Sequence, residues 1–86
     1  AKGGLAPWQE RRVVEHLRSH LADDVTLIEL AELVDLSVFH FARAFKESTG
    51  VPPYAYLRGL RCERARELLE TTDRPVTEIA FDVGYE

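Results

Sequence analysis

The chain has 86 residues, 45% of them hydrophobic and 30% charged, which is the composition of one small soluble domain and not of a disordered or collagen-like chain. No uncharged run approaches the roughly 18 to 20 residues of a transmembrane helix, and no secretory signal is recognisable. The single cysteine, Cys62, cannot form an internal disulfide, which favours a reducing compartment, the cytoplasm by default.

The first residues of the chain, Ala1-Lys2-Gly3-Gly4, resemble no structural motif, and the sequence contains no methionine. We therefore expect residues 1–6 to be linker or vector-derived residues. For the same reason we expect the chain to be one piece of a longer protein.

Charge is distributed unevenly along the chain. The net charge of −4 at first argues against a nucleic-acid partner, because phosphate binding uses lysine and arginine. However, residues 37–66 carry six basic and two acidic side chains, whereas residues 1–36 and 67–86 have net charges of −3 and −5. Charges act within a Debye length of roughly 8 to 10 Å, so the basic centre can meet phosphates locally. The alternative interpretation of this basic segment is an ordinary solvated helix surface of mixed charge.

The first two predicted helices follow from hydrophobic spacing and from a capping motif. Residues 7–21 form an amphipathic helix, because the apolar residues Val13, Val14, Leu17 and Leu21 recur at steps of three and four. Thr26 and Glu29 match a capping box, so a second helix begins at Leu27. Its buried stripe is expected to be Leu27, Leu30, Ala31 and Val34.

A third helix is predicted after a sharp turn at Asp35, a residue type that tolerates the left-handed conformation. Ser37 is a good N-cap and Gly50 a good C-cap, so this helix is expected to run from Ser37 to Thr49. Phe41 and Phe45 lie on one of its faces, and Phe39, Ala42, Arg43 and Lys46 lie on another.

The longest predicted helix follows two prolines and runs from Tyr54 to Thr71. After a break at residues 73–75, Val76 to Val83 repeat a short helical pattern and Gly84 forms a turn. No segment alternates with period two, so the predicted fold class is all-α. The apolar face of the long helix is expected to contain Tyr56, Leu57, Leu60, Ala65, Leu68 and Leu69.

An internal repeat relates the two short helices with an offset of 49 residues. Residues 27–31 align with 76–80, and residues 34–35 with 83–84; three positions are identical and three more conserve residue type. Each copy has an alanine followed four positions later by a turn residue, which is the steric pattern of a helix-turn-helix. Two unrelated short helices that share this pattern are the alternative. By the same offset, the second copy would continue from Glu86 to about position 99, beyond the chain.

The segments Leu30–Ser37, His40–Lys46 and Thr49–Pro52 resemble the DNA-binding domain of the AraC/XylS transcription regulators. Residues 56–57 and 61–69 are similar to the linking helix of that family, and residues 75–85 to the start of its second helix-turn-helix. The likeness covers roughly residues 8–86. It implies a homeodomain-like first helix-turn-helix unit over residues 7–51, a linking helix over 53–72, and a second unit over 75–86 that is truncated before its recognition helix.

The resemblance implies sequence-specific binding of operator or promoter duplex DNA, without catalysis, cofactor or metal, at the nucleoid of a bacterial cytoplasm. RNA polymerase is a further candidate partner, and an effector domain is not visible in this chain. The helix Ser37–Thr49 would enter the major groove, where Arg43 can make a bidentate contact to guanine. The implied base contacts are Phe39, Ala42 and Arg43, and the implied phosphate contacts are Ser37, Val38, His40, Lys46 and Arg58.

Three departures from the family pattern stand in the sequence: Asp35 replaces a frequent glycine, the net charge is acidic, and the second recognition helix is absent. A different class of function is a helical interaction module, in which the arginine-rich face of residues 54–70 meets an acidic protein. We expect the tail from Val76 to be poorly anchored, with incomplete cover for Ile79, Phe81 and Val83.

Other residues have simpler interpretations than a ligand site. His16 and His20 have a zinc-compatible spacing, but two surface histidines are the expected reading, because no glutamate follows His16. A metalloenzyme is therefore the third-ranked function. Cys62 is expected to face the core, and Trp8 to cover the first helix.

Overall fold

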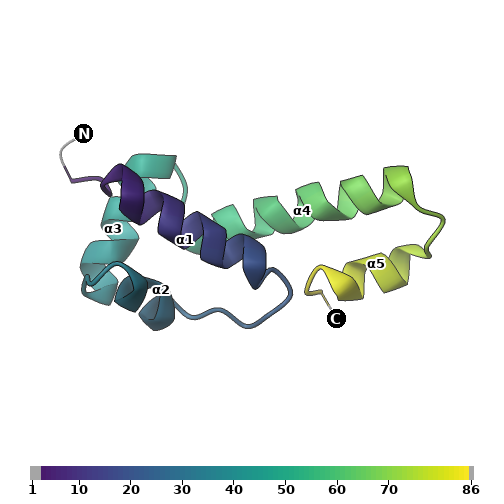
Figure 1. Ribbon diagram of the computed structural model, residues 1–86, viewed down its shortest axis with the longest axis horizontal. Coiled ribbons are helices and arrows are strands. Elements are labelled where there is room, and N and C mark those ends of the chain that lie inside the picture. The colour runs from purple at the N-terminus through teal and green to yellow at the C-terminus, as the bar shows by residue number, and fades with distance from the viewer. Residues whose placement is uncertain (1–2, 86) are drawn as a thin grey trace.

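The computed structural model describes residues 3–85 and contains five α-helices in that range (Figure 1). They are α1 (Pro7–Ser19), α2 (Leu27–Leu33), α3 (Val38–Thr49), α4 (Pro53–Thr71) and α5 (Val76–Asp82). The described residues form no strand, so the predicted all-α class is confirmed. Within the same range, no helix combines the length and the apolarity that a membrane crossing requires. Ala1, Lys2 and Glu86, which the predicted linker and second unit include, lie outside the described residues.

The helices are arranged along an elongated molecule of 45 × 21 × 17 Å. Figure 1 shows α1, α2 and α3 gathered around the start of α4, with α3 standing across that end of the molecule. The rest of α4 extends away from this group, and α5 folds back beside it. The main core cluster joins the first four helices, and a second cluster consists of Leu68, Ile79 and Val83. Leu21 packs against both clusters.

The structure confirms the predicted helix caps and the predicted left-handed turn. The Thr26 hydroxyl accepts a hydrogen bond from the Glu29 amide at 3.2 Å, and the Ser37 hydroxyl accepts one from the His40 amide at 3.2 Å. Asp35 adopts a left-handed φ of 57°, and α3 ends at a left-handed glycine. The expected end of the first helix is wrong by two residues, because the backbone leaves the helical conformation at His20 and frees Leu21 to pack between the clusters.

The backbone of the two short helices confirms the internal repeat. In the first copy, the Leu36 amide donates to the Ala31 carbonyl at 3.0 Å, and in the second the Tyr85 amide donates to the Ala80 carbonyl at 2.9 Å. The turn residue has a positive φ in both copies, because Gly84 adopts 107° where Asp35 adopts 57°. The second copy therefore makes the same turn as the first.

Three predictions of side-chain burial are wrong. Cys62 is exposed, Leu69 is 50% exposed and Trp8 is 52% exposed. The linking helix buries only the stripe that faces α1–α3 along its first half and α5 along its second, and neither Cys62 nor Leu69 lies on that stripe. Burial also reaches into the expected linker, where Leu5 joins the main core and its amide donates to the Ser48 hydroxyl at 2.7 Å.

The expectation that the tail is poorly anchored is wrong for two of its three residues. Ile79 and Val83 are each 1% exposed and pack against Leu68 of α4. Arg74 adds ion pairs to two acidic side chains of α5. Only Phe81, which is 71% exposed, lacks cover as expected. The short helix α5 is therefore held by α4.

Candidate nucleic-acid interface

The third helix has one fully buried face, which fixes how its other face is presented. Phe41, Ala44 and Phe45 are at most 1% exposed and belong to the main core. The Phe45 ring meets the Tyr56 ring edge-on with centroids 5.4 Å apart, so α3 is tied to α4 as well as to α2. Rigid packing on this side holds the opposite side chains in fixed directions.

The opposite face of α3 is exposed and carries most of the residues that the sequence singled out. Phe39 is 74% exposed, and the Arg43 guanidinium carbon lies 5.9 Å from the centre of its ring. This cation–π contact restrains Arg43 while its hydrogen-bond donors stay in solvent. Ala42 is half-buried, and the remaining exposed positions are Ser37, Val38, His40, Lys46 and Glu47.

The predicted site residues do not all lie together. Seven of them belong to α3 or to its N-cap, but Arg58 lies on α4. By helical spacing, Arg58 shares a face with Tyr54 and Arg61, whose side chains donate hydrogen bonds to the loop before α2. Arg58 therefore lies on an exposed position of α4 and not on the α3 face that carries Arg43.

Glu47 was missed by the sequence analysis, although it lies four residues after Arg43. It lines a surface hollow with Phe39, His40 and Arg43, and a second hollow with Lys46. A carboxylate at this position repels phosphates and reduces the positive charge of the α3 face. The i, i+4 spacing to Arg43 was the available signal.

The cations of the α3 face are not neutralised by ion pairs. Within residues 3–85, ion pairs involve His16, Arg64 and Arg74, whereas Arg43 and Lys46 form none. Free donors on an exposed helix are what a phosphate or a base edge requires. Of the six basic residues in the segment 37–66, α3 therefore presents two accessible cations, Arg43 and Lys46, and the other four lie on α4.

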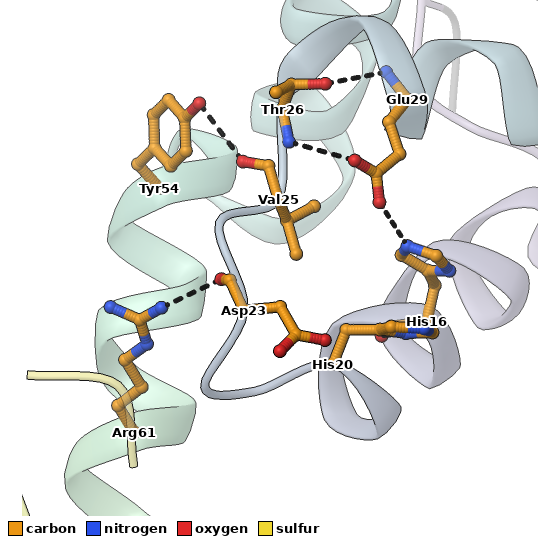
Figure 2. Close-up of polar contacts among 8 residues, drawn as sticks. All are labelled: His16, His20, Asp23, Val25, Thr26, Glu29, Tyr54 and Arg61. Carbon is orange, nitrogen blue, oxygen red and sulfur yellow. Dashed lines mark hydrogen bonds and ion pairs between the residues drawn. The ribbon is translucent and has the colours of Figure 1, made fainter. Parts of the chain in front are cut away.

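His16 of α1 contacts the first turn of α2, and His20, the C-cap of α1, lies beside it (Figure 2). His16 Nε2 lies 2.8 Å from the Glu29 carboxylate, whose other oxygen accepts from the Thr26 amide at 3.4 Å. The His20 ring stacks on His16 with centroids 4.1 Å apart. Both histidines are half-buried rather than on the surface as predicted. No cluster of three metal-ligating side chains occurs in the part of the chain that the structure describes.

The His16–Glu29 contact predicts a pH dependence of folding. The hydrogen bond from His16, together with that from the Thr26 backbone, lowers the pKa of Glu29 below its ordinary value of 4.5. Because the folded pKa is depressed, this contribution to stability is present above pH 4.5 and is lost as the pH falls through the folded pKa.

Urea unfolding from about pH 6 to about pH 3 measures this effect. We expect the Glu29→Gln variant to lose less stability across that range than the unchanged chain, because glutamine can still accept from the Thr26 amide but does not titrate. Parallel losses in the two proteins would contradict the assignment.

Comparisons with known proteins agree with this geometry. A family model described as a helix-turn-helix domain matches residues 30–86. The chain is 37% identical to the uncharacterized HTH-type transcriptional regulator YbfI of Bacillus subtilis over 75 aligned residues. This alignment covers 87% of the present chain and 27% of YbfI. The chain is 41% identical to the HTH-type transcriptional activator RhaS of Escherichia coli over 69 aligned residues. This alignment covers 80% of the present chain and 25% of RhaS. The chain thus spans about a quarter of the length of these relatives.

Solved structures share the fold as well. The C-terminal domain of AraT, a response regulator from Geobacillus stearothermophilus, is 35% identical with a TM-score of 0.82, covering 94% of this chain and 67% of that one. The DNA-binding domain of the transcriptional factor AdpA, solved with a target DNA, is 32% identical with a TM-score of 0.81, covering 91% and 70%. These relatives are regulators and not enzymes, in agreement with the expectation from the sequence. The chain belongs to the AraC-type helix-turn-helix family, as its resemblance in sequence indicated.

Proposed function

We propose that this chain binds double-stranded DNA sequence-specifically, with α3 as a recognition helix in the major groove. The observation that carries the proposal is the exposed face of α3, where Arg43 and Lys46 are unpaired and Phe39 stands in solvent. The helix-turn-helix geometry of α2 and α3 supports this placement, because the second helix of such a unit enters the groove. The similarity to AdpA, which was solved with a target DNA, supports the same ligand.

The residues of α3 have different proposed tasks. Arg43 reads a guanine through two hydrogen bonds, and Phe39 and Ala42 offer apolar contact, for example to a thymine methyl group. Glu47, which the sequence analysis did not include, can accept a hydrogen bond from cytosine if a base lies beside it.

Phosphate contacts are proposed for Lys46 on α3 and for Arg58 on α4, with smaller contributions from Ser37, Val38 and His40. The Ser37 hydroxyl already caps α3, so its backbone and the following amides are the better donors. These contacts position the protein without reading sequence.

The whole protein is proposed to regulate transcription in a bacterial cytoplasm, at the nucleoid. A second helix-turn-helix unit, which α5 begins, would read a second DNA segment. A regulator bound at a promoter has RNA polymerase as its natural partner, and we propose that partner for the whole protein.

The alternative interaction module receives less support from the structure. Its arginine-rich face was expected on the linking helix, but Arg61 donates to loop carbonyls and Arg64 pairs with Glu67. Two of the four arginines are therefore occupied within the chain, whereas the cations of α3 are free.

The experiment that tests the proposal is fluorescence anisotropy with a labelled random-sequence duplex between roughly 50 and 200 mM salt. We expect weak binding that falls steeply with salt, and a large gain in affinity when the chain is extended through a complete second unit. Selection from a randomised duplex pool should then give a consensus. Absence of binding by both versions would overturn DNA binding and favour a protein partner.

A further inference from the structure

Arg61 contacts both helix-turn-helix units at once. Its Nε donates to the Leu21 carbonyl at 2.8 Å, in the loop that leads into α2. Its Nη2 donates to the Asp23 carbonyl of the same loop at 3.2 Å (Figure 2). On its other side, the guanidinium carbon lies 5.4 Å from the centre of the Tyr85 ring, in the turn after α5. One side chain of α4 thus joins the loop of the first unit to the turn of the second.

The turn after α5 is shaped to receive this arginine. A Cβ atom added to Gly84 would lie 2.7 Å from the Arg61 guanidinium carbon and 2.8 to 2.9 Å from two of its nitrogens. The equivalent residue of the first unit, Asp35, is exposed and carries a side chain. Glycine is therefore suited to position 84 for two reasons: it adopts a φ of 107°, and it leaves room for the close approach of Arg61. At the equivalent Asp35 of the first unit, only the positive φ is required.

We propose that Arg61 is a positioning residue that fixes the start of the second recognition helix relative to the first unit. By the 49-residue offset, Tyr85 corresponds to Leu36, which directly precedes the Ser37 cap of α3. Holding the Tyr85 ring against Arg61, which is itself bound to the loop before α2, therefore fixes where the helix after Tyr85 begins. This inference rests on the proposed function, because the geometry between units matters for reading two segments of one duplex.

The chemistry of arginine suits this position. Its planar guanidinium can donate in two directions and stack on an aromatic ring at the same time, whereas a lysine ammonium cannot do all three. The loop is also held elsewhere, because the Tyr54 hydroxyl donates to the Val25 carbonyl at 3.3 Å. Removal of Arg61 should therefore release the turn after α5 without unfolding the first unit.

Residual dipolar couplings of the DNA-free chain test the proposal separately from DNA binding. In the unchanged chain, we expect one alignment tensor to fit α1–α3, α5 and the turn at residues 83–85. In Arg61→Gln, the couplings of Gly84 and Tyr85 should no longer fit the tensor of α1–α3, whereas those of α5 should still fit it, because the Leu68 cluster and the Arg74 ion pairs hold α5 to α4. Exchange of the Gly84 and Tyr85 amides should accelerate by about tenfold or more. Couplings of Gly84 and Tyr85 that still fit the single tensor in Arg61→Gln would overturn the proposal.

Matched variants sharpen the result. Arg64→Gln removes an arginine one turn away that pairs only with Glu67, and it should keep the single tensor. Gly59→Ala, a second substitution on α4 that meets no atom within 4 Å, should likewise keep the single tensor. Arg61→Lys should behave like Arg61→Gln, because lysine lacks the planar guanidinium group. If the couplings of Arg61→Lys equalled those of the unchanged chain, the proposed role of the guanidinium group would be overturned.

Discussion

The Phe45→Ala variant is expected to lose about 3 to 5 kcal/mol of folding free energy, which is the usual cost of truncating a buried phenylalanine. Phe45 is 0% exposed and its ring contacts those of Phe41 and Tyr56, with centroids 5.7 and 5.4 Å away. Its removal leaves a cavity where α3 joins α4. Because small domains have a total stability of about 5 to 15 kcal/mol, the variant should be partly unfolded near physiological temperature.

Urea unfolding followed by circular dichroism measures this loss, and the same helix supplies the control. Phe39→Ala removes the same side chain from the exposed face and should change stability by no more than about 0.5 kcal/mol. It should instead weaken DNA binding, because the Arg43 guanidinium loses the ring beside it. Similar stability losses in the two variants would show that the two faces of α3 are wrongly assigned.

The second large effect is expected for Arg43→Ala, which should reduce discrimination at one base pair by about 1 to 3 kcal/mol. The physical reason is the loss of a bidentate donor pair, which reads guanine and is poorly replaced by water. Arg43→Lys keeps the charge but lacks the planar fork, so it should lose most of the discrimination and little of the non-specific affinity. Competition against duplexes that differ at single positions of a selected site measures both quantities.

Lys46→Ala is the matched comparison on the same face. A phosphate contact should weaken binding to all sequences similarly and reduce the slope of log affinity against log salt by about one. If Arg43→Ala also weakened every sequence equally, Arg43 would be a phosphate ligand and the proposed base readout would fail.

The sequence predicted those features that neighbouring residues determine. The capping box at Thr26, the Ser37 cap and the left-handed Asp35 all depend on local hydrogen bonds and backbone sterics, and the structure has all three. The exposed face of α3 followed from helical spacing against two buried phenylalanines. Only Glu47 was missed there, because the sequence analysis looked for basic and apolar residues on this face and did not consider the acidic one.

The errors concern contacts between segments that are distant in the sequence. Cys62 and Leu69 were expected in the core, but the positions of α1–α3 and α5 decide which face of α4 is covered, and both residues lie off that face. Leu5 packs into the main core, and its amide donates a hydrogen bond to Ser48, which lies 43 residues away in the sequence. Likewise, neither the partner of His16 nor the position of Arg61 between two units has a signature in local spacing.

The division of the interior into two clusters has a consequence for how the molecule opens. The smaller cluster contains only three buried side chains within the described range, and Leu21 is its shared partner with the main core. Regions with few buried contacts undergo sub-global unfolding at a lower free energy than the main core. We therefore expect α5 to detach in a cooperative step of its own, well below global denaturation, while α1, α2 and α3 remain assembled. Such a domain unfolds at two free energies, a lower one that detaches α5 and a higher one that unfolds the main core.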